Sequence, residues 1–459
     1  MLVRYLLYLA IVLPLATINA QTPTQNLEKY WAYRQRLIGT ADKAGFVDIG
    51  LGQGQSIPAL ERFPHTDCAT DWYMQHHSCS PHEGTGRLHW SDATLYLGHY
   101  MAILALEYAN LYRANQSTEA VAQELWYALE AFERLDSLAE VTLGLEGKKD
   151  GFFLRDDIAA TFYLKTDSTA DRRFGKGEFT FDCTSSAYTC GEPKVDDGVF
   201  ISQDQVTGLL VGFMTINQLI ADHRYQPNLP TFGEKVSLNM HRIASYMMRY
   251  NWQLKGPEGT DIPNKWGGNA IGLSYPIGKI ANHITQQKYG DDYLGNGAKL
   301  LGKPIYKLLH ASLAWQSEIN RGLAMSTFSL LENTPATLLA RKAIKEQLII
   351  YPLLHAVLFR KPLSHKIEQH LFEDLLHTAP PEGPCFNSPD CMAPDGWKSY
   401  DRWIHPDFVN GNPHGIHSES PGLDYMLLYN LYHYYYYTDL PAYHAPENVL
   451  DYSLPAWQY

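Results

Sequence analysis

The sequence predicts an all-α fold in which helical hairpins close into a ring, with long loops and minor β hairpins between them. The first observation is that segments with helical periodicity alternate between two kinds: some are apolar on nearly every side, and others carry one apolar stripe. The second is that strand patterns do not alternate with helix patterns, which argues against a parallel α/β sheet. Since no low-complexity linker divides the chain, residues 21–459 are expected to form one domain.

The two kinds of helix come in pairs. The segment 92–112 is apolar almost all round and must be buried on most sides, whereas 119–140 has the stripe of an outer helix. The same pair recurs at 203–221 and 234–250. Further helices are expected at 271–287, 303–332, 336–360, 364–377 and 422–437, and short β hairpins near 152–154 and 199–201.

Local signals mark the beginnings of three of these helices. Thr231 and Glu234 match a capping box, in which each residue bonds the backbone of the other. Thr334-Pro335 and Ser420-Pro421 combine an N-cap residue with a proline in the first helical position.

Composition excludes several classes of protein. With 45% hydrophobic and 13% aromatic residues among 459, the chain is too apolar to be disordered. Its net charge of −12, without basic runs, argues against nucleic acid or anionic membranes as partners. The 31 tyrosines suit contacts with sugars, because each ring has an apolar face and a polar tip.

The N-terminus reads as a secretory signal peptide over residues 1–20. Arg4 is followed by an apolar run to Ile18, and small residues lead to a cleavage site near Ala20. The run is short for a membrane span, so we expect no stable membrane insertion, although an N-terminal anchor is the alternative. A secreted or periplasmic protein is predicted.

The six cysteines agree with an oxidising compartment. Fifteen pairings of six cysteines are possible, and proximity in the sequence favours three local disulfides. The pairs are Cys68 with Cys79, Cys183 with Cys190, and Cys385 with Cys391.

The alternation of inner and outer helices resembles the (α/α) toroid of six-hairpin glycosidase-like proteins, which are secreted or periplasmic enzymes acting on polysaccharides. The resemblance is architectural and covers most of the mature chain; no catalytic motif is matched residue by residue. It implies an active cleft at the end of the toroid where the inner helices begin.

Three expected inner helices begin beside carboxylates, the third of them after a polar loop that holds Glu419. Asp92 starts the first, after His89 and Trp90, and it also suits a simple helix cap. Asp204 begins the second.

At the second helix, Ser202 and Gln205 fit a capping box, which leaves Gln203 and Asp204 unexplained. A carboxylate between two amides suits acid or base catalysis with substrate hydrogen bonds beside it.

A polar loop precedes the last expected helix. It supplies Trp403, His414, His417 and Glu419. It is interpreted as a sugar-binding loop, with a solvated loop and a zinc site (the two histidines with Asp407 or Glu419) as the alternatives. Because the spacing is weak evidence for zinc, no metal or cofactor is predicted.

Two further loops add candidates. Arg155 is followed by Asp156 and Asp157, so one acid can pair with the arginine while the other stays available, or both can serve a structural ion pair. The second loop holds two adjacent glycines, which allow close backbone approach, or a plain turn. It contributes Trp266, Asn269 and, further on, Tyr275 and His283.

The leading functional prediction is a secreted glycoside hydrolase that acts on a polysaccharide or oligosaccharide. It needs two carboxylates: Asp204 is the first choice, with Asp157 or Asp92 as partner and Glu419 in reserve. The expected stacking platforms are Trp90, Trp266 and Trp403, and the expected hydroxyl ligands are Gln203, Gln205, Asn269 and Arg155. Serine-hydrolase, P-loop, Rossmann and HExxH motifs are absent.

Three other functions stay open. A polysaccharide lyase on the same fold would use His89, Tyr275, His283 and Arg155. A non-catalytic glycan-binding surface protein would keep the aromatic residues without needing the acids. A zinc-dependent phosphoesterase is the weakest option.

Overall fold

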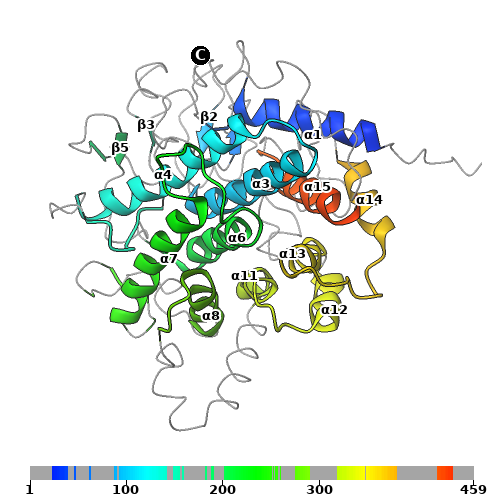
Figure 1. Cartoon of the computed structure of the whole chain (residues 1–459). Helices are drawn as coiled ribbons and strands as arrows, with labels where there is room; N and C mark the ends of the chain where they lie inside the picture. The colour runs from blue at the N-terminus through cyan, green and yellow to red at the C-terminus, as the bar shows by residue number, and fades with distance from the viewer. Residues whose placement is uncertain are drawn as a thin grey trace, which may run out of the picture.

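A computed structural model shows how the chain folds (Figure 1). It describes residues 23–39, 46–47, 61–63, 87–89, 93–141, 148–155, 158–159, 181–182, 188–190, 201–250, 252, 254–256, 259, 274–289, 318–346, 348–379 and 421–437. Within these ranges the chain is mostly helical with a few very short strands, which confirms the predicted all-α class. None of the helices in these ranges is both long enough and apolar enough to cross a bilayer.

Five helices form a closed cycle of contacts at the centre of the molecule (Figure 1). In order around the cycle they are α3 (Ala93–Arg113), α6 (Gln203–Leu219), α11 (Glu318–Ser329), α13 (Ile350–Phe359) and α15 (Leu423–Tyr436), which returns to α3. A further helix, α8 (Ser274–Thr285), packs against α6 and α11.

The other helices in the described part of the chain lie outside this cycle. They are α1 (Pro23–Ile38), α4 (Glu119–Val141), α7 (Phe232–Arg249), α12 (Ala336–Glu346) and α14 (Gln369–Thr378). Each of these helices except α1 packs on an inner helix that directly precedes or follows it in the sequence. Helix α1 packs on α15. Central helices α3 and α6 are buried along most of their length, as the apolar composition of 92–112 and 203–221 predicted.

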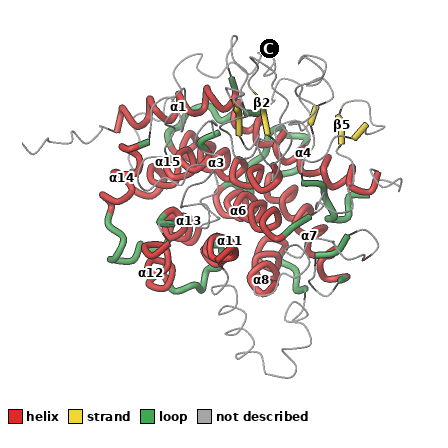
Figure 2. The backbone as a smooth tube through the Cα atoms, turned by 180° about the vertical axis from the view of Figure 1, so that it is seen from behind, coloured by secondary structure: helices red, strands yellow, loops and turns green. Residues whose placement is uncertain are grey.

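The described strands form two small antiparallel sheets. The first pairs β1 (Glu61–Phe63) with β2 (Arg87–His89). The second has the order β3 (Ile158–Ala159), β5 (Tyr188–Cys190), β4 (Phe181–Asp182). Figure 2 shows both sheets along one edge of the helical body. Residues 152–154, where a hairpin was expected, form no strand, and Leu154 makes a single β bridge. The Leu154 amide donates to the Leu135 carbonyl of α4 at 3.3 Å, and its carbonyl accepts from the Thr94 hydroxyl of α3 at 3.0 Å.

Two helix predictions need correction. Helix α1 was not predicted, because its polar residues interrupt the apolar stripe. The single helix expected over 336–360 is two helices, α12 and α13, and Pro352 lies in the first turn of the second. A proline is tolerated in a first turn and disrupts a helix interior, so it marks the new start.

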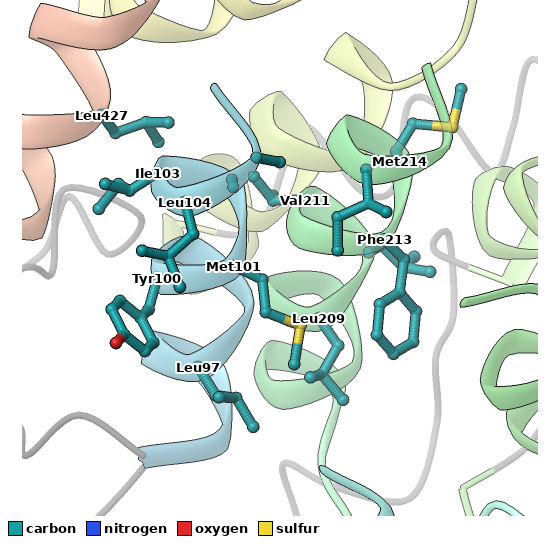
Figure 3. Packing of buried hydrophobic residues seen from close by; sticks show 14 of the residues in the cluster. Leu97, Tyr100, Met101, Ile103, Leu104, Leu209, Val211, Phe213, Met214 and Leu427 are labelled. Atoms are coloured by element: carbon teal, nitrogen blue, oxygen red, sulfur yellow. The ribbon is translucent and has the colours of Figure 1, made fainter. Parts of the chain in front are cut away.

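Glycines make the close contact between α3 and α6 possible. Figure 3 shows the apolar side chains of the two helices around this contact, among them Met101 and Leu209. A Cβ added at Gly98 would lie 1.9 Å from the Gly208 carbonyl oxygen, and one added at Gly212 would lie 2.5 Å from the Gly98 carbonyl oxygen. Gly208 in turn faces the backbone of Leu95. Contacts therefore advance along both helices together, so α3 and α6 run in the same direction.

Helix α15 runs in the same direction on the other side of α3. The Asn430 side chain donates to the Ile103 carbonyl at 3.3 Å, and Asn110 donates to the Asn430 carbonyl at 3.3 Å. Nearer the C-terminal ends, Arg113 donates to the carbonyls of Tyr434 and Tyr437 at 2.8 and 3.0 Å. The first turns of α3, α6 and α15 consequently lie towards one end of the molecule.

Replacing Gly98 by alanine tests the contact between α3 and α6. Because its Cβ would overlap backbone rather than a flexible side chain, we expect a loss of about 3 kcal/mol in the free energy of unfolding. Urea denaturation measures this. As the control, Leu238→Ala on the exposed face of α7 should change stability by less than about 0.5 kcal/mol. Equal stability of Gly98→Ala and the parent protein would contradict the packing.

Candidate functional site

The first turn of α6 holds the leading candidate, Asp204. Ser202 is the N-cap residue, and its amide donates to Gln205 Oε1 at 3.1 Å, so the predicted capping box forms. Asp204 Oδ1 accepts hydrogen bonds from the Ser202 hydroxyl and, at 3.1 Å, from the Gln205 amide. Its side chain is half-buried, while those of Gln203 and Gln205 are buried. Asp204 thus helps to cap α6 and stays partly accessible to solvent.

Arg155 lies against the first turn of α3. Its carbonyl accepts a hydrogen bond from the Thr94 amide at 2.9 Å and another from the Thr94 hydroxyl, which also donates to the Leu154 carbonyl at 3.0 Å. The Arg155 side chain is half-buried. These bonds satisfy donors at the start of α3 that have no partner within the helix.

The glycine contact brings Asp204 and Arg155 to the same end of the molecule. Asp204 precedes Gly208 by four residues, and Gly208 packs on Leu95, so Asp204 is level with the start of α3. Arg155 is bound at that same start. Asp204 in the first turn of α6 and Arg155, which is bound to the first turn of α3, are therefore at the same end of two adjoining parallel helices.

Asp424, in the first turn of α15, is a candidate that the sequence analysis missed. Its Oδ1 accepts a hydrogen bond from the Tyr425 amide at 2.8 Å, and the residue is buried. Burial raises the pKa of Asp424 to about 7, against the opposing effects of the backbone amides and of Arg36. The sequence contains the pattern that would have identified Asp424. Like Asp204, it is an acidic residue in the first turn of a strongly apolar helix.

Asp424 lies deeper in the bundle than Asp204. It precedes Asn430 by six residues, and Asn430 contacts Ile103 and Asn110, so Asp424 is level with the region around Tyr100. That is about two helical turns, roughly 11 Å, beyond the start of α3. The two acids are consequently not a close pair.

His283 is not brought together with Asp204. It lies near the end of α8, where Nε2 contacts the Gln218 amide nitrogen, and its ring packs edge-on to Phe359 at 6.4 Å. Burial lowers the pKa of His283. Gln218 follows Asp204 by 14 residues along α6, roughly 21 Å at 1.5 Å per residue, so His283 belongs to the opposite end of the helices.

Two further predicted residues, His89 and Cys190, lie in short strands. His89 ends β2, opposite Glu61, and Cys190 ends β5; only their backbones are described. The following lie outside the described residues: Asp92, Asp157 and Glu419; Trp90, Trp266, Asn269, Trp403, His414 and His417; Cys68, Cys79, Cys183, Cys385 and Cys391.

Nothing in the described ranges resembles a metal centre, because no three His, Cys, Asp or Glu side chains come together there. Comparisons with protein-family models, curated proteins and solved structures find no match to this chain.

The raised pKa of Asp424 makes stability depend on pH. The unfolded carboxyl ionises near pH 4 and the folded one near pH 7, so stability falls as pH rises between these values. Asp424→Asn should remove this slope, up to about 1.4 kcal/mol per pH unit. Urea denaturation from pH 4 to 8 measures it, with Asp222→Asn on the exposed turn after α6 as control. An unchanged slope in Asp424→Asn would contradict the assignment.

Proposed function

We propose that the protein is a secreted carbohydrate-active enzyme that hydrolyses glycosidic bonds in a polysaccharide or oligosaccharide. The observation that carries the proposal is the alignment of the first turns of α3 and α6, which sets Asp204 and Arg155 at one end of a cycle of inner helices. At this end of the helices, polar side chains are held by rigid helices around an apolar core, and a catalytic site requires such rigid support.

The arrangement of the described helices supports the (α/α) toroid within this proposal. Inner helices contact one another in a closed cycle, and outer helices cover them from outside. Three of the inner helices run in the same direction, as their contacts establish. In a toroid of this kind the cleft would lie where these helices begin.

In this mechanism Asp204 is the ionised carboxylate. Hydrogen bonds from Ser202 and Gln205 favour its charged form, and partial exposure allows it to meet a substrate or a water. It acts as the base that activates water, or as the nucleophile, while a second carboxyl group protonates the leaving oxygen. Arg155 binds sugar hydroxyls beside it.

Four residues are candidates for the second carboxyl group, the one that protonates the leaving oxygen. Asp92 directly precedes α3 in the sequence, and Asp204 is level with the start of that helix, so Asp92 is tested first. Asp157 and Glu419 follow. Asp424 has the raised pKa of a catalytic acid, although its depth places it fourth.

The experiment incubates residues 21–459 with a panel of polysaccharides and measures new reducing ends and ultraviolet absorbance. We expect reducing ends without absorbance, and a loss of about 10²–10⁴-fold in turnover in Asp204→Asn. Asparagine keeps an oxygen that can accept the Ser202 and Gln205 hydrogen bonds, so α6 should stay capped. The matched control is Asp222→Asn, at the other end of α6, which should retain full turnover.

The other outcomes separate the alternatives. Absorbance from an unsaturated product would replace the hydrolase with a lyase. Glycan binding without turnover, unchanged in Asp204→Asn, would favour a glycan-binding protein. Full turnover in folded Asp204→Asn would refute the role of this residue.

A further inference from the structure

The segment 150–155 runs from the outer helices to the candidate site. Phe152 and Phe153 are buried and pack on aromatic rings of α7 and α4, with ring centroids 5.5 and 5.3 Å apart. At the end of the segment, the Arg155 carbonyl accepts the hydrogen bond from the Thr94 amide at the start of α3. Any shift of this segment therefore moves Arg155 relative to α3.

The beginning of the segment is held between α4 and α7, which contact each other (Figure 1). The Gly151 amide donates to Asp136 Oδ1 of α4 at 2.8 Å. Gly151 has a φ of 94°, and a Cβ added to it would lie 2.3 Å from the carbonyl carbon and oxygen of Arg242 of α7. Only glycine suits this conformation and this space. Asp136, Gly151 and Arg242 are called the α4–α7 clamp below.

Asp136 is the buried acid of this clamp. Its side chain is fully buried, and its Oδ2 accepts no hydrogen bond from the described part of the chain. Arg242 Nη1 lies 3.8 Å from Oδ2. The other charged groups around Asp136 are Glu133 of α4, Lys149 and Asp150 directly before Gly151, and Lys235 of α7, which contacts Glu133 at 3.1 Å.

The environment of Asp136 links the clamp to pH. Burial raises the pKa of Asp136 to about 7, against the opposing effects of the Gly151 amide and Arg242. If the segment opened and exposed Asp136 to water, the carboxyl group would ionise near pH 4. The closed segment thus binds the proton more tightly than the open one. Its stability is full below pH 4 and falls as the pH rises to about 7.

We propose that Asp136 is a positioning residue for the candidate site, which fixes the place of Arg155 through Gly151 and does so most firmly when it carries a proton. A protonated Asp136 still accepts the Gly151 hydrogen bond and buries no charge. The effect on glycan binding rests on the proposed function, in which Arg155 binds sugar hydroxyls. The clamp itself can be measured without a substrate.

Hydrogen–deuterium exchange of the protein between pH 5 and 8 tests the clamp. After correction for the intrinsic exchange rate, the opening equilibrium constant of peptides covering 150–155 should rise by up to tenfold per pH unit up to about pH 7 and then level off. Asp136→Asn keeps the acceptor for Gly151 without a charge, and its opening should be independent of pH. Asp222→Asn, on the exposed turn after α6, is the control and should behave like the parent protein.

Two further comparisons separate the clamp from overall stability. Peptides from α13 report global unfolding, and their exchange in Asp136→Asn should follow that of the parent protein. Arg242→Gln removes a cation that lowers the pKa of Asp136, so the rise in opening of 150–155 should continue above pH 7. If Asp136→Asn does not fold, Arg242→Gln and the parent protein decide.

The activity measurement uses a glycan that the panel identifies as a substrate. Asp136→Ala leaves the buried Gly151 amide without its acceptor, and KM should rise roughly tenfold. The change in kcat should be smaller, because Asp204 is held by α6 and not by the clamp. Asp136→Asn should restore KM.

The outcomes distinguish a failure of the clamp from a failure of the proposed function. An equal pH slope of 150–155 in the parent protein and Asp136→Asn would overturn the clamp, whether or not a glycan is hydrolysed. So would a slope that Asp136→Asn removes equally from 150–155 and α13, since that is a purely structural effect. The expected exchange without turnover of any glycan would support the clamp and count against the hydrolase alone.

Discussion

The backbone contact between α3 and α6 is the constraint on which the rest of the structure depends. Three glycines, Gly98, Gly208 and Gly212, let two buried helices approach until backbone meets backbone. Such a contact tolerates no sliding, because any side chain entering it would clash. It therefore fixes the relative height of the two helices, and with it the position of Asp204 beside the start of α3.

Helix α1 holds the first and last parts of the chain together through buried charges. Arg34 and Lys29 are both buried, and Lys29 donates to the carbonyls of Leu376, His377 and Ala379 at 2.9, 3.2 and 2.7 Å. These carbonyls at the end of α14 lack partners within the helix, and a cation also suits the negative end of the helix dipole. Stacking of Tyr30 on Tyr429, with ring centroids 4.7 Å apart, joins α1 to α15.

Periodicity predicted the central helices well, because their signals are local. The apolar segments 92–112 and 203–221 are α3 and α6 within two residues at either end, and the Thr231–Glu234 capping box forms with an amide-to-hydroxyl distance of 3.1 Å. Helix α1 was not predicted, because Lys29 and Arg34 interrupt its apolar stripe. Both side chains are buried, and the partners that make their burial possible lie more than 70 residues away in the sequence. A sequence shows such charges and not the groups that neutralise them.

The candidate site was predictable only in part, for the same reason. A carboxylate at the mouth of an apolar helix identified Asp204, and the same rule applied to α15 would have found Asp424. Whether two of these acids lie near one another depends on the direction of their helices and on how far each helix is shifted along its neighbour. Direction and shift are set by the contact of Gly208 with Leu95 and by that of Asn430 with Ile103, and each contact joins residues more than 100 positions apart. His283 is an example. The sequence analysis grouped it with Tyr275, but the two residues lie at opposite ends of α8.

The proposed function requires a glycan to bind where α3 and α6 begin. Hydrogen–deuterium exchange of Asp204→Asn, with and without a mixture of oligosaccharides from the polysaccharide panel, tests it most directly. We expect slower exchange in peptides covering 152–155 and 201–206, with no change around Gln218 and His283. Protection confined to Gln218, His283 and the neighbouring helix ends would place the binding site at the opposite end of the molecule and refute the proposed site.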